Sequence, residues 1–191
     1  MPYVSSGNRK MTCPTFNLPA CVTCPDKTEM CAKHCYARKA EKMYPDVLPC
    51  RKRNLADSEG PSFVRAMVDL VQRRARGGLF RIHESGDFYS QAYLDKWIAI
   101  AKACPGVRFL AFTKSFHLDF SKTPRNLQLI ASVWPDTRAR RPRNWPRAYA
   151  GDCKRMRRRT LECTGLCDSC GICWYMTENR GIVDAVHFDV H

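Results

Sequence analysis

The sequence predicts an α/β domain whose mostly parallel strands form a small partial (β/α) barrel. Short apolar runs at residues 79–83, 107–113 and 127–133 have the length and composition of buried strands. Segments with helical periodicity precede or separate several of these runs. About six strands are too few for a closed barrel of eight. We therefore expect the 191 residues to form one domain with an incomplete barrel.

Sequence signals bound the elements in the first half of the chain. Pro19 and Pro25 end the first strand and keep the following loop irregular. Gly60 and Pro61 begin a later helix, and Ser90 caps the helix after it. The expected elements are a strand at 15–18, a helix at 28–43, a break at 43–49, a helix at 61–76, a strand at 79–83 and a helix at 91–104.

The second half of the chain is expected to add strands at 107–113, 127–133, 148–150 and 182–190. A basic, proline-broken segment covers residues 138–159, with Trp145 and Tyr149 interleaved. It holds ten of the thirty-two basic residues, namely Arg138, Arg140, Arg141, Arg143, Arg147, Lys154, Arg155, Arg157, Arg158 and Arg159. Such a segment is typical of a phosphate-contacting surface, and a solvated flank is the alternative.

Composition limits the compartment and the class of partner. No signal peptide and no membrane-spanning run is expected, so the chain should be cytoplasmic, where its twelve cysteines bind metal rather than form disulfides. The formal net charge is +14. If seven of the cysteines held two iron–sulfur clusters as thiolates, the thiolates and the cluster cores together would lower the net charge only to about +11. This charge favours an anionic partner such as nucleic acid or a phosphorylated substrate, and no membrane.

The first cysteine loop and helix, residues 12–44, predict a metal site. Cys24, Cys31 and Cys35 have the spacing C-x6-C-x3-C. If residues 28–43 form one helix, the last two thiols lie one turn apart on one face, and Cys24 reaches them from the loop. Three thiolates suit an iron–sulfur cluster with one open iron. Cys21, His34 or Cys50 could instead close a tetrahedral zinc site.

The second cysteine loop, residues 160–175, packs four thiols into a short stretch. Their spacing is C-x3-C-x2-C-x2-C, formed by Cys163, Cys167, Cys170 and Cys173. A single zinc ion usually takes two pairs of ligands from separate chain directions, whereas overlapping C-x2-C steps suit a [4Fe–4S] cubane. We therefore expect two [4Fe–4S] clusters, with zinc as the alternative.

Polar residues follow successive predicted strands. In parallel α/β sheets the chemistry is located at the carboxyl ends of the strands. The loop that carries Cys24 follows the first strand, and Glu84, Ser85, Gly86 and Asp87 follow the second. We expect these four residues to bind a cofactor. Glu84, Asp87 and Lys114, the last following the third strand, are the catalytic candidates.

Five motifs together resemble the bacteriophage "gene product eighty-eight" family. They are Asn17–Pro25, Cys31–Ala37, Arg81–Phe88, Phe112–Ser115 and Cys170–Trp174, and they span most of the chain. The resemblance implies a phage origin, and with it the host cell cytoplasm. It implies little about chemistry.

The architecture is also similar to that of radical S-adenosylmethionine (SAM) enzymes, which are TIM-barrel-like. That resemblance implies a three-cysteine cluster whose open iron binds SAM, with Glu84–Asp87 in the place of a Gly-Gly-Glu strand end. It also implies an auxiliary cluster at Cys163–Cys173. The chain departs from that pattern, because C-x6-C-x3-C is not C-x3-C-x2-C and Glu84 precedes its glycine.

Three functions remain open from the sequence. The first, towards which we lean, is a radical-SAM-like enzyme. The second is a non-catalytic iron–sulfur protein that binds nucleic acid or a host protein through Arg155, Arg157, Arg158 and Arg159. The third is a zinc protein with the same basic surface. The fourth ligand of the first site distinguishes the first function from the second.

Overall fold

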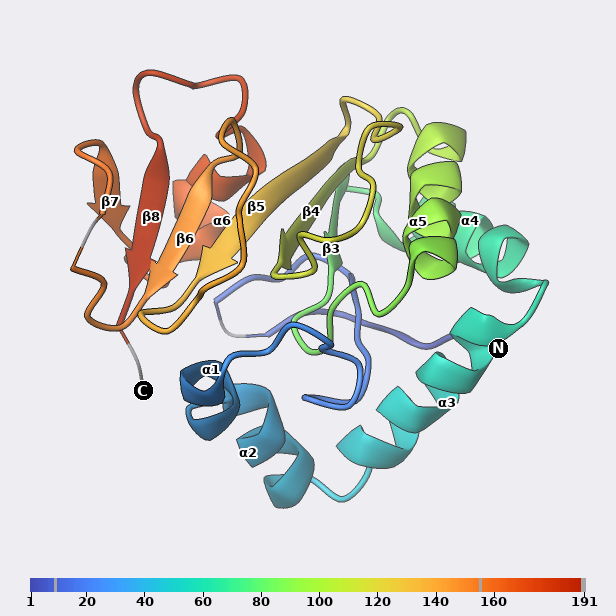
Figure 1. The fold of residues 1–191 in the computed structure, drawn as a ribbon. Helices are drawn as coiled ribbons and strands as arrows, with labels where there is room; N and C mark the ends of the chain where they lie inside the picture. Colours follow the sequence, from blue (N-terminus) through green and yellow to red (C-terminus); the bar gives the residue numbers. More distant parts are fainter. Residues whose placement is uncertain (9, 155, 190–191) are drawn as a thin grey trace.

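The computed structural model describes residues 1–8, 10–154 and 156–189, and it contains one open sheet of eight strands (Figure 1). The strand order is β1-β2-β3-β4-β5-β6-β8-β7. Neighbouring strands run parallel except β1 and β2, which are antiparallel. The strands are β1 (Val4–Ser5), β2 (Thr15–Phe16), β3 (Leu79–Ile82), β4 (Arg108–Thr113), β5 (Leu127–Val133), β6 (Arg147–Ala150), β7 (Thr160–Glu162) and β8 (Ala185–Phe188).

The mostly parallel α/β class is confirmed, whereas the expected small barrel is an open sheet that does not close on itself. The predicted count of about six strands was too low, because β1 and β7 have only two and three residues and lack an apolar run. These two strands form the edges of the sheet. The strand predicted at 182–190 is the shorter β8, and Val190 lies outside the described residues.

Helices lie beside the open sheet. They are α1 (Glu29–Lys33), α2 (Tyr36–Met43), α3 (Val47–Glu59), α4 (Phe63–Arg74), α5 (Gln91–Ala103), α6 (Cys167–Cys170) and the 3-10 turn η1 (Ile172–Trp174). Figure 1 shows α1 and α2 near the edge to which the arrowheads of β5, β6 and β8 point. This edge is formed by the carboxyl ends of the parallel strands. None of the helices in the described ranges is long and apolar enough to cross a membrane.

Two corrections concern the helices around the first cysteine loop. The helix expected at 28–43 is broken, because His34 caps α1 and Cys35, in extended conformation, begins α2. Cys31 and Cys35 are therefore not neighbours on one helical face. The break expected at 43–49 is also shorter than predicted, since α3 begins at Val47. Pro49 fits its first turn, where the missing N–H has no intrahelical partner to lose.

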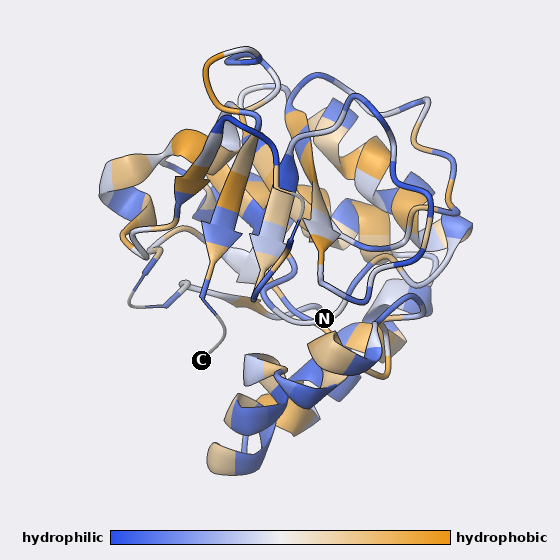
Figure 2. Cartoon of the chain, turned by 60° about the vertical axis from the view of Figure 1, so that its left-hand side comes forward, coloured by the Kyte–Doolittle hydropathy of each residue, from blue (hydrophilic) through white to orange (hydrophobic). Residues whose placement is uncertain are grey.

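Alternate strand residues belong to different hydrophobic cores, of which two are large and a third, smaller one contains Val133, Tyr149 and Ala185. Phe80 and Phe109 face α4 and α5 in a core that also holds Phe16 and Trp97. Leu110, next to Phe109, belongs to the core on the opposite face. That second core is covered by the end of the second cysteine loop and the segment after it, through Trp174, Met176 and Val183. In Figure 2 the apolar colour is concentrated in the strands and the helices packed against them, whereas the connecting loops are largely hydrophilic.

Candidate metal centre

Three contacts fix the first cysteine loop to the carboxyl ends of the strands. The Asp26 carboxylate lies 2.6 Å from Nδ1 of His117, which follows β4. The Met30 amide donates a 2.9 Å hydrogen bond to the carboxylate of Asp136, which follows β5. The His34 ring stacks on Trp134, with ring centroids 6.3 Å apart and planes at 20°. The sheet therefore positions the loop from several strands at once.

Two of the predicted catalytic residues lie beside the thiols of this loop. Burial raises the pKa of the Cys24 thiol to about 12, the Asp87 carboxylate raises it further, and the Lys114 ammonium opposes the rise. Burial also raises the pKa of Cys31, whereas the neighbouring Lys114 ammonium opposes the rise. The structure thus brings Asp87 and Lys114 to the candidate metal ligands.

Asp87 is buried, and its carboxylate accepts hydrogen bonds from residues at the end of the neighbouring strand β4. Its Oδ1 accepts a 2.6 Å hydrogen bond from the Thr113 hydroxyl, and its Oδ2 accepts a 2.9 Å bond from the Lys114 amide. The Phe88 amide adds a 2.8 Å bond to Oδ1. Burial raises the pKa of Asp87, and the Lys114 charge and these hydrogen bonds oppose the rise. The carboxylate therefore joins the ends of β3 and β4.

Glu84 lies apart from Asp87 and Lys114. Its carboxylate contacts the Asn8 amide group, the Thr15 hydroxyl at 3.3 Å and the Asn17 side-chain amide at 3.3 Å. These partners belong to the N-terminal segment, β2 and the residue after it. The structure thus separates the three catalytic candidates into two places.

Ser85 and Gly86 hold the cysteine loop against β3. The Ser85 hydroxyl donates a 2.8 Å hydrogen bond to the Leu18 carbonyl. Gly86 has a positive φ of 93°, and a Cβ at this position would lie 2.7 Å from the Thr23 hydroxyl. Glycine is thus required both for the backbone conformation and for the close approach of the two loops.

A fourth thiol joins the first group. The Cys21 thiol lies within electrostatic range of the Cys35 and Cys31 thiols. Burial raises the pKa of Cys21 to about 11, and the Cys35 thiol adds to the rise. Spacing alone favoured Cys24, Cys31 and Cys35 and left Cys21 as one of several alternatives. Its interval of C-x2-C before Cys24 was the available signal.

The second cysteine group lies on the sheet face opposite α4 and α5. Cys167 and Cys173 pack against the core that contains Trp174 and Met176. Burial raises the pKa of Cys173 to about 12, and the neighbouring thiols Cys163, Cys167 and Cys170 also raise it. The four predicted thiols are therefore neighbours.

Arg81 is the cation next to this second group, and the sequence analysis did not single it out. Its guanidinium lies 4.1 Å from the centre of the Phe112 ring, and its Nε donates a 3.2 Å hydrogen bond to the His83 carbonyl. From this position it lowers the pKa of both Cys167 and Cys173. A lone arginine within the otherwise apolar strand at 79–82 was the available signal.

The N-terminal segment is fixed to the second cysteine loop. The Thr12 amide donates hydrogen bonds of 3.0 and 3.2 Å to the two carboxylate oxygens of Asp168. The Cys167 amide donates a 2.8 Å bond to the Lys10 carbonyl. Both contacts lie within or next to the four-cysteine loop. Segments more than 150 positions apart therefore build this site together.

The basic segment lies between β5 and β7, with β6 inside it. Arg157 donates a 2.8 Å hydrogen bond to the Arg143 carbonyl and is partly buried, whereas Arg158 and Arg159 are exposed. Arg155 lies outside the described residues. The role of the basic segment stays a prediction.

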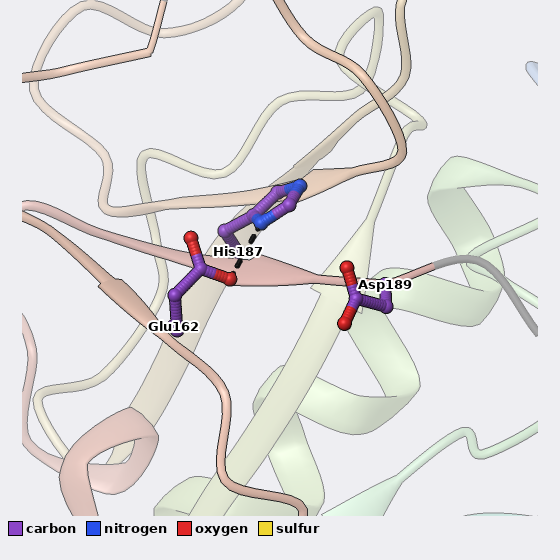
Figure 3. A group of neighbouring side chains, drawn as sticks. All are labelled: Glu162, His187 and Asp189. Carbon is purple, nitrogen blue, oxygen red and sulfur yellow. Dashed lines mark hydrogen bonds and ion pairs between the residues drawn. The ribbon is translucent and has the colours of Figure 1, made fainter.

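A third cluster of possible ligands consists of Glu162, His187 and Asp189, whose candidate ligand atoms lie within 4.8 Å of one another (Figure 3). Nδ1 of His187 lies 2.7 Å from the Glu162 carboxylate, and Nε2 lies 2.9 Å from the Gly151 carbonyl. These acceptors raise the pKa of His187. Since both ring nitrogens face oxygens, the contacts suit a protonated imidazole that joins β7, β8 and the end of β6.

The donor sets of the two cysteine groups fit iron–sulfur clusters. None of the described cysteines forms a disulfide. Each group gathers four thiols and lies beside a cation, Lys114 at the first and Arg81 at the second. Cysteine thiolates are the ligands that hold such clusters.

The chain matches one family of known proteins. The family model described as "Gene product 88" matches residues 3–176. The chain is 36% identical over 128 residues to the "Gene 88 protein" of Mycobacterium phage L5, covering 60% of this chain and 53% of that protein. It is 34% identical over 128 residues to the "Gene 88 protein" of Mycobacterium phage D29, with the same coverage. The chain thus spans about half the length of the curated relatives it matches. No solved structure matches it.

Proposed function

This chain belongs to the phage gene product 88 family, and from that premise we propose that it is an iron–sulfur protein with a [4Fe–4S] cluster at each of its two cysteine groups. The observation that carries this proposal is the assembly of eight unpaired thiols into two groups of four, each beside a cation. Cys21, Cys24, Cys31 and Cys35 form the first group. Cys163, Cys167, Cys170 and Cys173 form the second.

Iron is favoured over zinc by the chain path at the second group. All four thiols come from one short segment that contains α6 and η1. A single zinc ion needs its ligands in a small tetrahedron, which usually takes two separate chain directions. Overlapping steps of three residues suit the wider spread of a cubane. Zinc remains the competing metal at both groups.

The protein residues around the two groups would set the properties of the clusters. A bound [4Fe–4S] cluster exchanges single electrons, and its potential depends on burial and neighbouring charge. Lys114 would balance the negative charge of the first thiolate group and Arg81 that of the second. The core around Trp174 and Met176 would exclude water from one side of the second group. We therefore propose a redox role for the pair of clusters.

The radical-SAM-like enzyme is the alternative for the first group. The cysteine loop after β2 and the Glu84–Asp87 turn after β3 favour it, because radical SAM enzymes have cofactor residues at these places. It requires an open iron and free groups to bind SAM. The carboxylates of Glu84 and Asp87 are already held by protein hydrogen bonds. This distribution of contacts favours the redox role over SAM chemistry.

Nucleic-acid binding is a second candidate function, independent of the first. The net charge of +14 and the exposed Arg158 and Arg159 favour it. A host protein with an acidic surface is the other partner that this charge would suit.

Removing one cluster at a time tests the two-cluster proposal. Cys31→Ala should remove the first cluster and Cys170→Ala the second, so each variant should keep about half of the iron and of the absorption near roughly 400 nm. Cys104→Ala is the control, since Cys104 is a buried thiol in the helix-side core. Loss of all iron in one variant with full retention in the other would contradict two independent clusters.

A further inference from the structure

Cys21 has a backbone conformation that is unusual for a residue with a side chain. Its φ is +63°, in the left-handed region. That region is sterically unfavourable for a residue with a Cβ atom. Such strain persists where the surrounding contacts hold the residue in place, and it often accompanies functional sites.

A buried ion pair fixes the turn that carries Cys21. The amide of the preceding residue, Ala20, donates a 2.8 Å hydrogen bond to Oε1 of Glu41. Arg51 lies 2.9 Å from the same oxygen and also donates a 3.1 Å bond to the Ala37 carbonyl. Both charged side chains are only 10% exposed. The turn is thus attached to α2 and, through Arg51, to α3.

The same helix carries the thiol that Cys21 contacts. Cys35 is the N-cap residue of α2, and Glu41 lies further along that helix. Fixing Ala20 to Glu41 on this helix therefore fixes the neighbouring Cys21 relative to Cys35, and the two thiols lie within electrostatic range of each other. Cys24, three residues after Cys21, and Cys31, in the middle of α1, complete the group.

Cys50 lies near the start of α3, and three other spare cysteines have contacts elsewhere. Cys13 is buried next to Arg81 and Asp168, at the second group. Cys104 belongs to the helix-side core. Cys153 hydrogen-bonds to the carbonyls of Val133 and Ala150. Of these thiols and Cys21, only Cys21 makes a described contact with the first group.

We propose that Cys21 is the fourth thiolate ligand of the first cluster, together with Cys24, Cys31 and Cys35. The first cluster then has no open iron, and its site serves electron transfer rather than SAM binding. This inference rests on the proposed iron–sulfur function. It differs from the spacing-based expectation of three ligands, in which the fourth iron is free.

The test uses Cys21→Gly, because glycine adopts a φ of +63° without strain and the variant should fold at least as well as the native chain. Anaerobically purified native protein, Cys21→Gly and the control Cys104→Ala are treated with ferricyanide, an oxidant that extracts an iron lacking a thiolate ligand. Formation of a [3Fe–4S] cluster is then followed by electron paramagnetic resonance (EPR). SAM is added separately to the dithionite-reduced proteins.

The proposal predicts no [3Fe–4S] signal from the native protein or from Cys104→Ala. It predicts either that signal from Cys21→Gly or loss of the first cluster, which is about half of the iron. It also predicts that SAM leaves the native EPR spectrum unchanged. A [3Fe–4S] signal of equal size in the native protein and Cys21→Gly, or a change on adding SAM to the native protein, would overturn it. Native protein without iron would instead refute the proposed function itself, so the two failures are distinguishable.

Discussion

The carboxylate of Glu41 lies 2.9 Å from the guanidinium of Arg51, and this pair joins α2 to α3. Both side chains are 10% exposed, and the same carboxylate accepts the Ala20 amide at 2.8 Å. The ion pair therefore connects two helices to the loop that carries the first thiols. Its integrity should affect both the stability of the fold and the geometry of the first metal site.

Arg51→Met should destabilise the protein strongly, because it leaves the Glu41 carboxylate buried without its cation. Breaking one partner of a buried pair costs about 3–5 kcal/mol. The free energy of unfolding in urea measures the effect. Arg53→Met on the exposed side of the same helix is the matched control and should change it by less than about 0.5 kcal/mol. Equal values for the two variants would show that the pair contributes little.

Asp168→Ala should loosen the second cysteine loop, since it removes both hydrogen bonds to the Thr12 amide. The expected loss of stability is about 1 kcal/mol. In a Cys31→Ala background, where only the second cluster is expected, its absorption should bleach faster in air. Asp69→Ala, at an exposed position of α4, is the control. Identical bleaching rates would indicate that the N-terminal segment does not protect this site.

The strands with apolar runs could be predicted, because their residues are buried on both faces of the sheet. Phe109 and Leu110 in β4 illustrate this, as each belongs to a different core. The helix α3 could not be predicted in the same way. Its buried residues are Arg51, Asn54 and Ser58, which have helical spacing but are polar. Hydrophobic periodicity therefore does not indicate this buried face.

The two cysteine groups could be predicted from spacing, but their surroundings could not. Arg81, Glu41 and Asp168 become neighbours of the thiols only through contacts between distant segments. Cys21 shows the same limit, because the contact between its neighbour Ala20 and Glu41 joins segments about twenty residues apart. Glu84 and Asp87 were also assigned to one site because they are close in the sequence. In the fold, their carboxylates contact different partners.

His83 should make the protein less stable as the pH falls below about 6.5. Burial lowers its pKa from 6.5 to about 3, and its Nε2 lies 2.8 Å from the Tyr93 hydroxyl. Since the folded-state pKa is depressed, the stabilising contribution is complete above the unfolded value of 6.5 and is lost as the pH falls towards about 3. The loss approaches about 1.4 kcal/mol per pH unit.

The variant His83→Asn isolates this effect, because asparagine tolerates the positive φ of 64° and does not titrate in this range. Its unfolding free energy should fall less steeply between pH 6.5 and 5 than that of the native protein, by about 2 kcal/mol in total. If the native protein and His83→Asn had parallel stability profiles against pH, His83 would bind its proton equally well in the folded and unfolded states.

The basic segment should bind nucleic acid with a steep dependence on salt if its arginines contact phosphates. The slope of log affinity against log salt changes by about 0.9 for each phosphate contact in duplex DNA. Replacing Arg158 and Arg159 with Gln should therefore reduce the slope by about two units in a fluorescence anisotropy titration. Gln at Arg73 and Arg74, which are exposed on α4, is the control of equal charge. If both double variants reduced the slope equally, or if the native protein did not bind at low salt, the segment would be a solvated flank.

Metal and sulfide analysis of anaerobically purified native protein tests the central claim most directly. Two [4Fe–4S] clusters predict about eight irons and about eight acid-labile sulfides per chain, with a broad absorption near roughly 400 nm that dithionite bleaches. Stoichiometric zinc without sulfide, and no absorption in that region, would contradict the account at both cysteine groups.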